Sequence, residues 1–293
     1  MRHAIFTVSM PRSTPEEAIA RIRDAGGHGI EWRIVNDTGD TAKPGFWSGN
    51  RCTLQADWSD AQFSRIAELT RAAGLAVPNL GTYVQAADLG QVERLMHVAR
   101  IFGAPALRIS FASYDGTAPY WRMLETARAQ LAGVIPLAER SGIKVLVEMH
   151  HHTLIPSASL AWMLVQGFPH ERVGVIYDAG NLIHEGFANH QLGLELLGPY
   201  LAHVHIKNAA PIPRTLSGPQ PLTFEAVWSP LRAGGVNFPR FFAGLRAVGY
   251  DGWLTIEDFS LGMDEPSALR DGFAFLNELA ALTDPKKAAS VTQ

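Results

Sequence analysis

The sequence predicts a single-domain α/β protein with a (β/α)8 TIM-barrel fold. Strand-like apolar runs alternate with amphipathic helical runs eight times within about 280 residues, a count and length typical of that barrel. No linker or low-complexity stretch interrupts the alternation. No G-x-G-x-x-G or Walker glycine pattern follows the first strand, which weighs against nucleotide-binding sheets. An open doubly wound sheet stays as the alternative, because a sequence does not show whether a sheet closes.

Local signals place the individual elements. The helix predicted at 14–27 has Thr14 as a candidate N-cap, Pro15 at its first position and glycines at its end. The strand predicted at 75–83 is weakened by Pro78, which has no N–H to donate to a neighbouring strand. The other strands are predicted at 4–10, 29–35, 106–114, 144–149, 173–180, 201–208 and 252–259. The other helices are predicted at 59–74, 88–104, 120–142, 157–168, 189–198, 238–249 and 265–282.

Composition narrows the class of protein. Hydrophobic residues make up 47% of the 293, enough for one large core, and we expect a barrel domain over residues 1–283 with a flexible tail at 284–293. A formal charge of −3 argues against a nucleic-acid partner. The one cysteine, Cys52, cannot form a disulfide within the chain, and no apolar run has the length of a signal-peptide core or a membrane span. We therefore expect a soluble cytoplasmic protein without a membrane partner.

Two predicted loops are longer than barrel geometry requires. One spans residues 36–58, after the second strand, and the other spans 209–237, after the seventh. Both would lie at the C-terminal face of a barrel, where active sites are found. Each is a candidate lid or oligomer contact, so the sequence is compatible with a homo-oligomer.

Polar residues end four consecutive predicted strands. The stretch KVLVEMHHHTL at 144–154 begins as a buried strand and ends in a carboxylate and three histidines. Because side chains alternate along a strand, Glu148 faces the barrel interior while the valines face the helices. The same alternation turns the ends of the next three strands inward at Asp178, His205 and Glu257. These four residues should converge at one end of the barrel.

A metal ion would explain such a cluster. Three carboxylates packed together repel one another unless a cation lies between them. Three oxygen donors and one nitrogen fit a single divalent ion, either Mn²⁺, Mg²⁺, Co²⁺ or Zn²⁺. The donor set does not choose among these ions; we expect Mn²⁺ first.

Other polar residues are candidates for contact with a substrate. His150 shares the inward face of the fifth strand and is a candidate catalytic group, whereas His151 should point the other way. Lys207, at the mouth of the seventh strand, is a candidate for binding a substrate carboxylate or phosphate. His203 lies one step deeper than His205, where we expect it to support the core or the metal site through hydrogen bonds.

Three residues on two other strands are less clearly assigned. Arg33 and Glu31 share a face of the second strand, with Arg33 nearer the mouth. Arg33 is therefore a substrate-binding candidate, and a salt bridge between the two is the competing interpretation. Arg108, on the fourth strand, is expected to be too deep for contact with a substrate.

Four motifs resemble those of the xylose-isomerase-like TIM-barrel superfamily of sugar isomerases and epimerases. They are VLVEMHH, VGVIYDAGNLIHEG, HVHIKN and GYDGWLTIEDF, and the likeness covers roughly residues 4–282. The resemblance implies that the metal ligands are Glu148, Asp178, His205 and Glu257. These are the residues that strand alternation selects independently.

The resemblance also implies a reaction. Members of the superfamily act on sugars, keto-sugars and polyols, and Glu148 and Glu257 would transfer protons on opposite faces of an enediolate. Ketose epimerases carry a histidine where this chain has Asn181, and many relatives carry an aspartate where it has Asn208, which weighs against a ketohexose epimerase. Asn181 is kept as a substrate-binding candidate.

Other activities occur on related barrels. Metal-dependent dehydroshikimate dehydratases place a catalytic base at the position of His150, and other relatives cleave 3-keto-glycosides by β-elimination, so a lyase is the leading alternative. An apurinic-site endonuclease would need more histidine ligands and a basic groove. A catalytically silent barrel would be expected to lose Glu148 or Glu257, and both are present.

Overall fold

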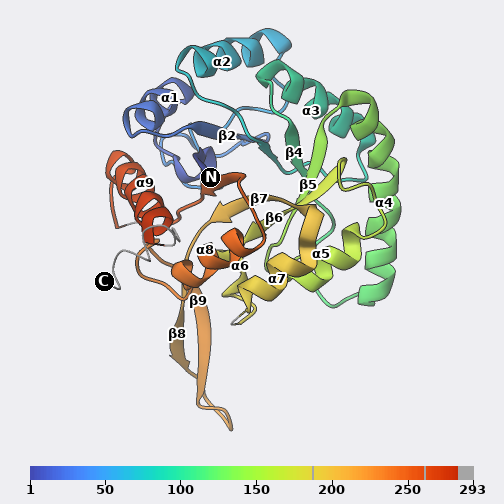
Figure 1. The fold of residues 1–293 in the computed structure, drawn as a ribbon, viewed down its shortest axis with the longest axis vertical. Coiled ribbons are helices and arrows are strands. Elements are labelled where there is room, and N and C mark those ends of the chain that lie inside the picture. Colours follow the sequence, from blue (N-terminus) through green and yellow to red (C-terminus); the bar gives the residue numbers. More distant parts are fainter. Residues whose placement is uncertain (187, 261, 283–293) are drawn as a thin grey trace.

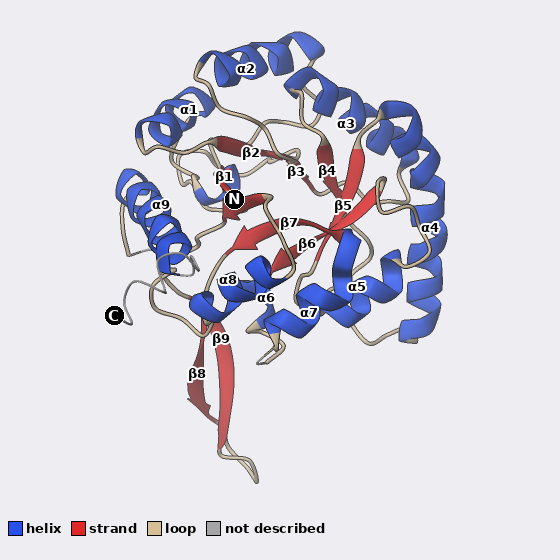
Figure 2. Ribbon diagram, viewed as in Figure 1, coloured by secondary structure: helices blue, strands red, loops and turns tan. Residues whose placement is uncertain are grey.

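Eight parallel strands close into a barrel at the centre of the molecule (Figures 1 and 2). The computed structural model describes residues 1–186, 188–260 and 262–282, so the predicted tail at 284–293 lies outside the described residues. The strands follow one another around the barrel in chain order, and β1 closes against β10. The predicted barrel is therefore confirmed. Its strands are β1 (Arg2–Phe6), β2 (Gly29–Ile34), β3 (Leu80–Thr82), β4 (Ala106–Ile109), β5 (Lys144–Glu148), β6 (Val173–Asp178), β7 (Leu201–Ile206) and β10 (Trp253–Ile256).

Helices surround the barrel (Figure 2). The predicted cap of the first helix is present, since the Glu17 N–H donates to Thr14 Oγ1 and the Thr14 N–H donates to the Glu17 carboxylate at 2.8 Å. The helices are α1 (Pro15–Asp24), α2 (Asp60–Ala72), α3 (Leu89–Phe102), α4 (Tyr120–Ser141), α5 (Ala158–Val165), α6 (Ala179–Leu182), α7 (His190–Leu197), α8 (Phe238–Ala247) and α9 (Glu265–Leu282). Among these helices none is long and apolar enough to cross a membrane.

The core has an outer and an inner part. Outward-facing strand residues such as Val145 and Val147 pack in the large cluster shared with the helices. Inside the barrel Ala106, Leu146 and Ile176 form a small apolar floor. Side chains that follow Leu146 on its face therefore lie inside the barrel above the floor.

Each of the eight barrel strands is shorter than predicted, and the first and third illustrate the reasons. The first ends at Phe6, because residues Thr7–Ser9 form a 3-10 turn. The third is limited to Leu80–Thr82, which agrees with the missing N–H of Pro78. The 3-10 turn after β1 therefore places irregular backbone at the C-terminal face of the barrel, whereas β3 is shortened mainly at its N-terminal end.

The long segment after β7, predicted as a loop, contains a β-hairpin. Strands β8 (Ala209–Thr215) and β9 (Leu222–Trp228) pair antiparallel and project away from the barrel (Figure 1). The base of the hairpin is fixed by Asn208, whose Oδ1 accepts the N–H groups of Ala209 and Val236. Prolines in β8 concealed the strand, because proline rarely occurs inside a sheet. Its predicted role as a lid or oligomer contact stays a prediction.

Candidate metal centre

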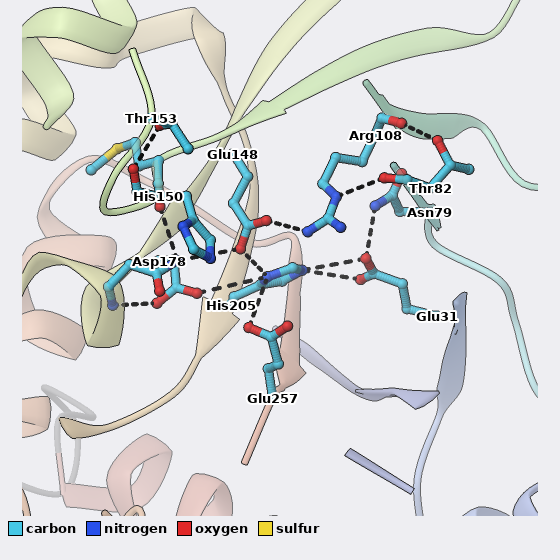
Figure 3. Close-up of polar contacts among 12 residues, drawn as sticks. Glu31, Asn79, Thr82, Arg108, Glu148, His150, Thr153, Asp178, His205 and Glu257 are labelled. Carbon is cyan, nitrogen blue, oxygen red and sulfur yellow. Dashed lines mark hydrogen bonds and ion pairs between the residues drawn. The ribbon is translucent and has the colours of Figure 1, made fainter. Parts of the chain in front are cut away.

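The four predicted ligands meet above the apolar floor, at the C-terminal ends of neighbouring strands (Figure 3). His205 Nδ1 lies 3.1 Å from Glu148 Oε1 and 3.9 Å from both Asp178 Oδ2 and Glu257 Oε2. Asp178 and His205 face each other in the register of β6 and β7. All four side chains are buried.

These distances suit a single divalent ion. Donors bound at about 2.1 Å to one ion lie about 3.0 Å apart at a right angle and about 4.2 Å apart on opposite sides. The separations from His205 Nδ1 fall within that range. Asp178 Oδ2 is buried and accepts no well-aligned hydrogen bond, although the Lys207 ammonium lies 2.9 Å away. The residues present therefore fit a metal ion.

The charges of the site lead to the same conclusion. Four buried carboxylates lie within it, on Glu31, Glu148, Asp178 and Glu257. Two buried cations, Arg108 and Lys207, pair with three of them and leave a formal charge of −2 when the histidines are neutral. Without an ion, burial lowers the pKa of His205 but Glu31 and Glu148 outweigh burial and raise it well above its usual value, so a protonated ring offsets part of this charge. A divalent cation that takes the place of that proton would bring the total to zero.

Glu148 is held from two sides. Arg108 Nη1 donates to Glu148 Oε2, while Glu148 Oε1 faces His205. Burial would raise the pKa of Glu148, but Arg108 and His205 outweigh burial and lower that pKa well below its usual range. Arg108 also lines the cavity above the site, so the expectation that it lies too deep was wrong. Its guanidinium is steadied by the Thr82 carbonyl at 3.0 Å from Nε.

Replacing Arg108 tests this pair through stability. Arg108→Met would leave Glu148 buried without its countercharge, and we expect the metal-free protein to lose about 3–5 kcal/mol of unfolding free energy in urea titrations. Arg140→Met is the control, because Arg140 pairs with Glu93 on the surface at 3.2 Å and should cost at most about 1 kcal/mol. Equal losses in the two variants would contradict the role of Arg108.

Glu257 and Lys207 form the opposite wall of the site. The Lys207 ammonium contacts Glu257 Oε2 and lies 2.9 Å from Asp178 Oδ2. Burial raises the pKa of Glu257 to about 7, even though Lys207 acts in the opposite direction. Lys207 is buried rather than free at the mouth, although it still lines the cavity, and its predicted contact with a substrate anion stays a prediction.

The three consecutive histidines separate in an unexpected way. His150 Nδ1 lies 2.7 Å from the His151 carbonyl, which only accepts hydrogen bonds, so the neutral ring carries its proton on Nδ1 and leaves Nε2 as an acceptor. His151 stacks between His150 and His184, at ring-centroid distances of 4.2 and 3.9 Å. It also lines the cavity, so the expectation that it points away was wrong. Strand β5 ends at Glu148, so the alternation of inward and outward side chains along the strand does not extend to His151.

The two remaining substrate-binding candidates do not line the cavity. Arg33 donates to Asp37 and to the Trp47 carbonyl, both at 3.0 Å, and so braces the long loop after β2. The competing interpretation, a salt bridge between Arg33 and Glu31, is wrong, because Arg33 pairs with Asp37 and Glu31 faces the histidines of β7. Asn181 donates to the Met149 carbonyl at 3.1 Å and lies beside Glu148 Oε1. Substrate-binding roles for Arg33 and Asn181 stay predictions.

A cavity of about 450 Å³ opens above the site. Glu148, Glu257 and His150 reach its wall, together with Arg108 and Lys207. Five Trp, Tyr or Phe side chains enclose it further, namely Trp47, Tyr83, Phe111, Trp228 and Phe259. Its size and mixed lining suit a small polar ligand with one apolar face.

The family of the chain follows from its sequence as a whole. A profile of the family described as xylose isomerase-like TIM barrel matches residues 19–279. The chain belongs to this family. No curated protein matches the sequence closely enough to add a nearer relative.

Solved structures of xylose isomerase-like barrels share the fold at low identity. An L-ribulose 3-epimerase superposes with a TM-score of 0.74 at 17% identity, covering 100% of this chain and 98% of the other. The IolI protein with a bound zinc atom gives 0.75 at 14% identity, with 97% and 100% covered. A 3-keto-D-glucoside 4-epimerase from E. coli gives 0.66 at 17% identity, with 95% and 99% covered. At these identities the comparison establishes the fold.

One buried residue of this xylose isomerase-like barrel was missed as part of the site. Glu31 lies behind His205 and contacts the Nε2 atoms of both His203 and His205. From the sequence, Glu31 was expected only as a salt-bridge partner of Arg33. The available signal was a carboxylate inside GIEWRI, a strand that is buried along its whole length.

Proposed function

We propose that this protein is a divalent-metal-dependent isomerase or epimerase that acts on a sugar, keto-sugar or polyol. The observation that carries the proposal is the convergence of three carboxylates and one imidazole beneath a cavity of about 450 Å³. The similarity in fold to sugar epimerases supports it. Mn²⁺ is the ion that we propose first, and Zn²⁺, the ion named with the IolI structure, is the nearest competitor.

The chemistry needs a polarised carbonyl and a positioned base. A divalent ion held by Glu148, Asp178, His205 and Glu257 would make the C–H beside a substrate carbonyl more acidic. Glu148 ends β5 and Glu257 directly follows β10, and both reach the cavity with two strands between them. Carboxylates on two sides of a bound substrate would let one remove the proton and the other return it to the opposite face. Return to the same carbon gives an epimer, and return to the neighbouring carbon gives an isomer.

His150 supports a second candidate function. Its Nδ1 is committed to the His151 carbonyl, so Nε2 is a neutral acceptor on a residue that lines the cavity. A base placed there would remove the proton beside a carbonyl while the substituent on the next carbon leaves with the electron pair. That reaction is a β-elimination on a 3-keto-glycoside or dehydroshikimate-like substrate, and it makes the protein a lyase.

Incubation in D₂O distinguishes the two functions. The protein loaded with Mn²⁺ or Zn²⁺ is mixed with a panel of keto-sugars, 3-keto-glycosides and 3-dehydroshikimate and followed by NMR. We expect deuterium to enter one substrate beside its carbonyl without loss of a substituent. A new alkene or a released aglycone would instead identify the lyase. If no substrate of the panel shows either change, both functions are contradicted for these substrate classes.

A further inference from the structure

The two nitrogens of the His205 ring face carboxylates on opposite sides (Figure 3). Nδ1 faces the cavity side, 3.1 Å from Glu148 Oε1. Nε2 faces away from the other three carboxylates, 3.3 Å from each oxygen of Glu31. Glu31 comes from β2, across the barrel from β7, and its side chain is fully buried.

A neutral imidazole carries one proton and offers one lone pair. Because an ionised carboxylate only accepts, Glu31 keeps the proton of a neutral ring on Nε2, and the lone pair of Nδ1 then points at Glu148, Asp178 and Glu257. With the proton on Nδ1 instead, the ring would donate to Glu148 and could not bind a cation there. We propose that Glu31 is a positioning residue that fixes His205 with its proton on Nε2 and so makes Nδ1 the metal-binding nitrogen. This inference rests on the proposed metal-dependent function.

Glu31 is itself fixed by residues from other strands. Asn79 Nδ2, just before β3, donates to its Oε1 at 2.9 Å. His203 Nε2 lies 3.0 Å from its Oε2 and 2.9 Å from Thr255 Oγ1 on β10. The carboxylate therefore has little freedom to move away from His205. A carboxylate that hydrogen-bonds the second nitrogen of a metal-binding histidine also makes that histidine a stronger ligand.

A second metal ion between Glu31, His203 and His205 is the competing explanation, since one atom from each lies within 4.8 Å of the others. The contacts favour hydrogen bonds. The 3.0–3.3 Å separations between the Glu31 oxygens and the histidines fit either explanation, but Asn79 points an N–H donor at the same carboxylate and His203 Nε2 also meets Thr255 Oγ1 at 2.9 Å. None of the three residues lines the cavity and all three are buried, so an ion there would be out of contact with the cavity.

The test compares metal affinities. Chelator-stripped wild type and Glu31→Gln are titrated with Zn²⁺ or Mn²⁺ against a competing chelator of known affinity, and unfolding curves check that both proteins are folded. We expect Glu31→Gln to bind the ion about 10- to 100-fold more weakly with one equivalent bound at saturation. Glu265→Gln is the matched control, because Glu265 accepts hydrogen bonds near α1 and away from the site, and its affinity should equal that of the wild type.

A second measurement needs no variant of Glu31. In the Zn²⁺-loaded wild type with ¹⁵N-labelled histidine, long-range ¹H–¹⁵N spectra should show the His205 proton on Nε2, with the signal assigned by its loss in His205→Asn. A proton on Nδ1, an unchanged affinity in folded Glu31→Gln, or two bound equivalents would overturn the inference while leaving the proposed function standing. A wild type that binds neither ion would overturn both.

Discussion

Glu257→Gln is expected to lower turnover by about 100- to 10,000-fold on whichever substrate proves active, with a much smaller change in substrate affinity. The amide keeps the shape of the side chain but cannot take up or return a proton, and general acid–base catalysis typically contributes that range. Glu257 reaches the cavity beside Lys207, so the loss should appear in kcat rather than in KM. Steady-state kinetics at saturating Mn²⁺ measure both.

The control separates the loss of a base from the loss of a metal ligand. The bound metal is quantified in the same samples, and only fully loaded Glu257→Gln is compared with fully loaded wild type. Glu265→Gln again serves as the matched variant and should retain full turnover. Unchanged turnover in loaded Glu257→Gln would remove this residue as acid or base.

Removal of the metal is expected to reduce turnover to the background rate. Without an ion the carbonyl is not polarised, and the buried charge of the site is left unbalanced. Dialysis against a chelator followed by a metal assay defines the stripped protein, and added Mn²⁺ or Mg²⁺ should restore the activity. Full turnover by protein shown to contain no metal would contradict the proposed mechanism.

The four candidate ligands could be predicted from the sequence because two local rules sufficed. Each is the inward-facing residue at the end of its strand, and consecutive parallel strands bring such ends to one rim of a barrel. The register of Asp178 opposite His205 is the outcome that those rules anticipate. Neither rule required knowledge of contacts across the barrel.

The same rules could not predict the contacts of residues whose partners lie across the barrel. Glu31 on β2 meets His205 on β7, and alternation alone gave it a neighbour on its own strand, Arg33. The actual partner of Arg33 is Asp37, in a loop whose path the sequence does not specify. Strand alternation predicts the direction of a side chain but not the opposing side chain that it meets.

Irregular segments account for the other differences. The alternation that correctly turned Glu148 inward ends with β5, and the backbone beyond it brings His151 to the cavity as well. The hairpin of β8 and β9 was concealed because its prolines are typical of loops. In both places the chain follows tertiary contacts rather than a local period.

The most direct test of the metal centre is a titration of the stripped protein with Mn²⁺, followed by the EPR signal of the free ion. We expect the wild type to bind one equivalent of Mn²⁺ and the affinity for Mn²⁺ to fall sharply in Asp178→Asn. The reason is that Asp178 Oδ2 is a buried candidate metal ligand that accepts no well-aligned hydrogen bond. Turnover measured in the same titration should rise in step with the bound ion. Equal binding of Mn²⁺ by Asp178→Asn, or turnover that does not follow the bound metal, would contradict a catalytic metal centre at these four residues.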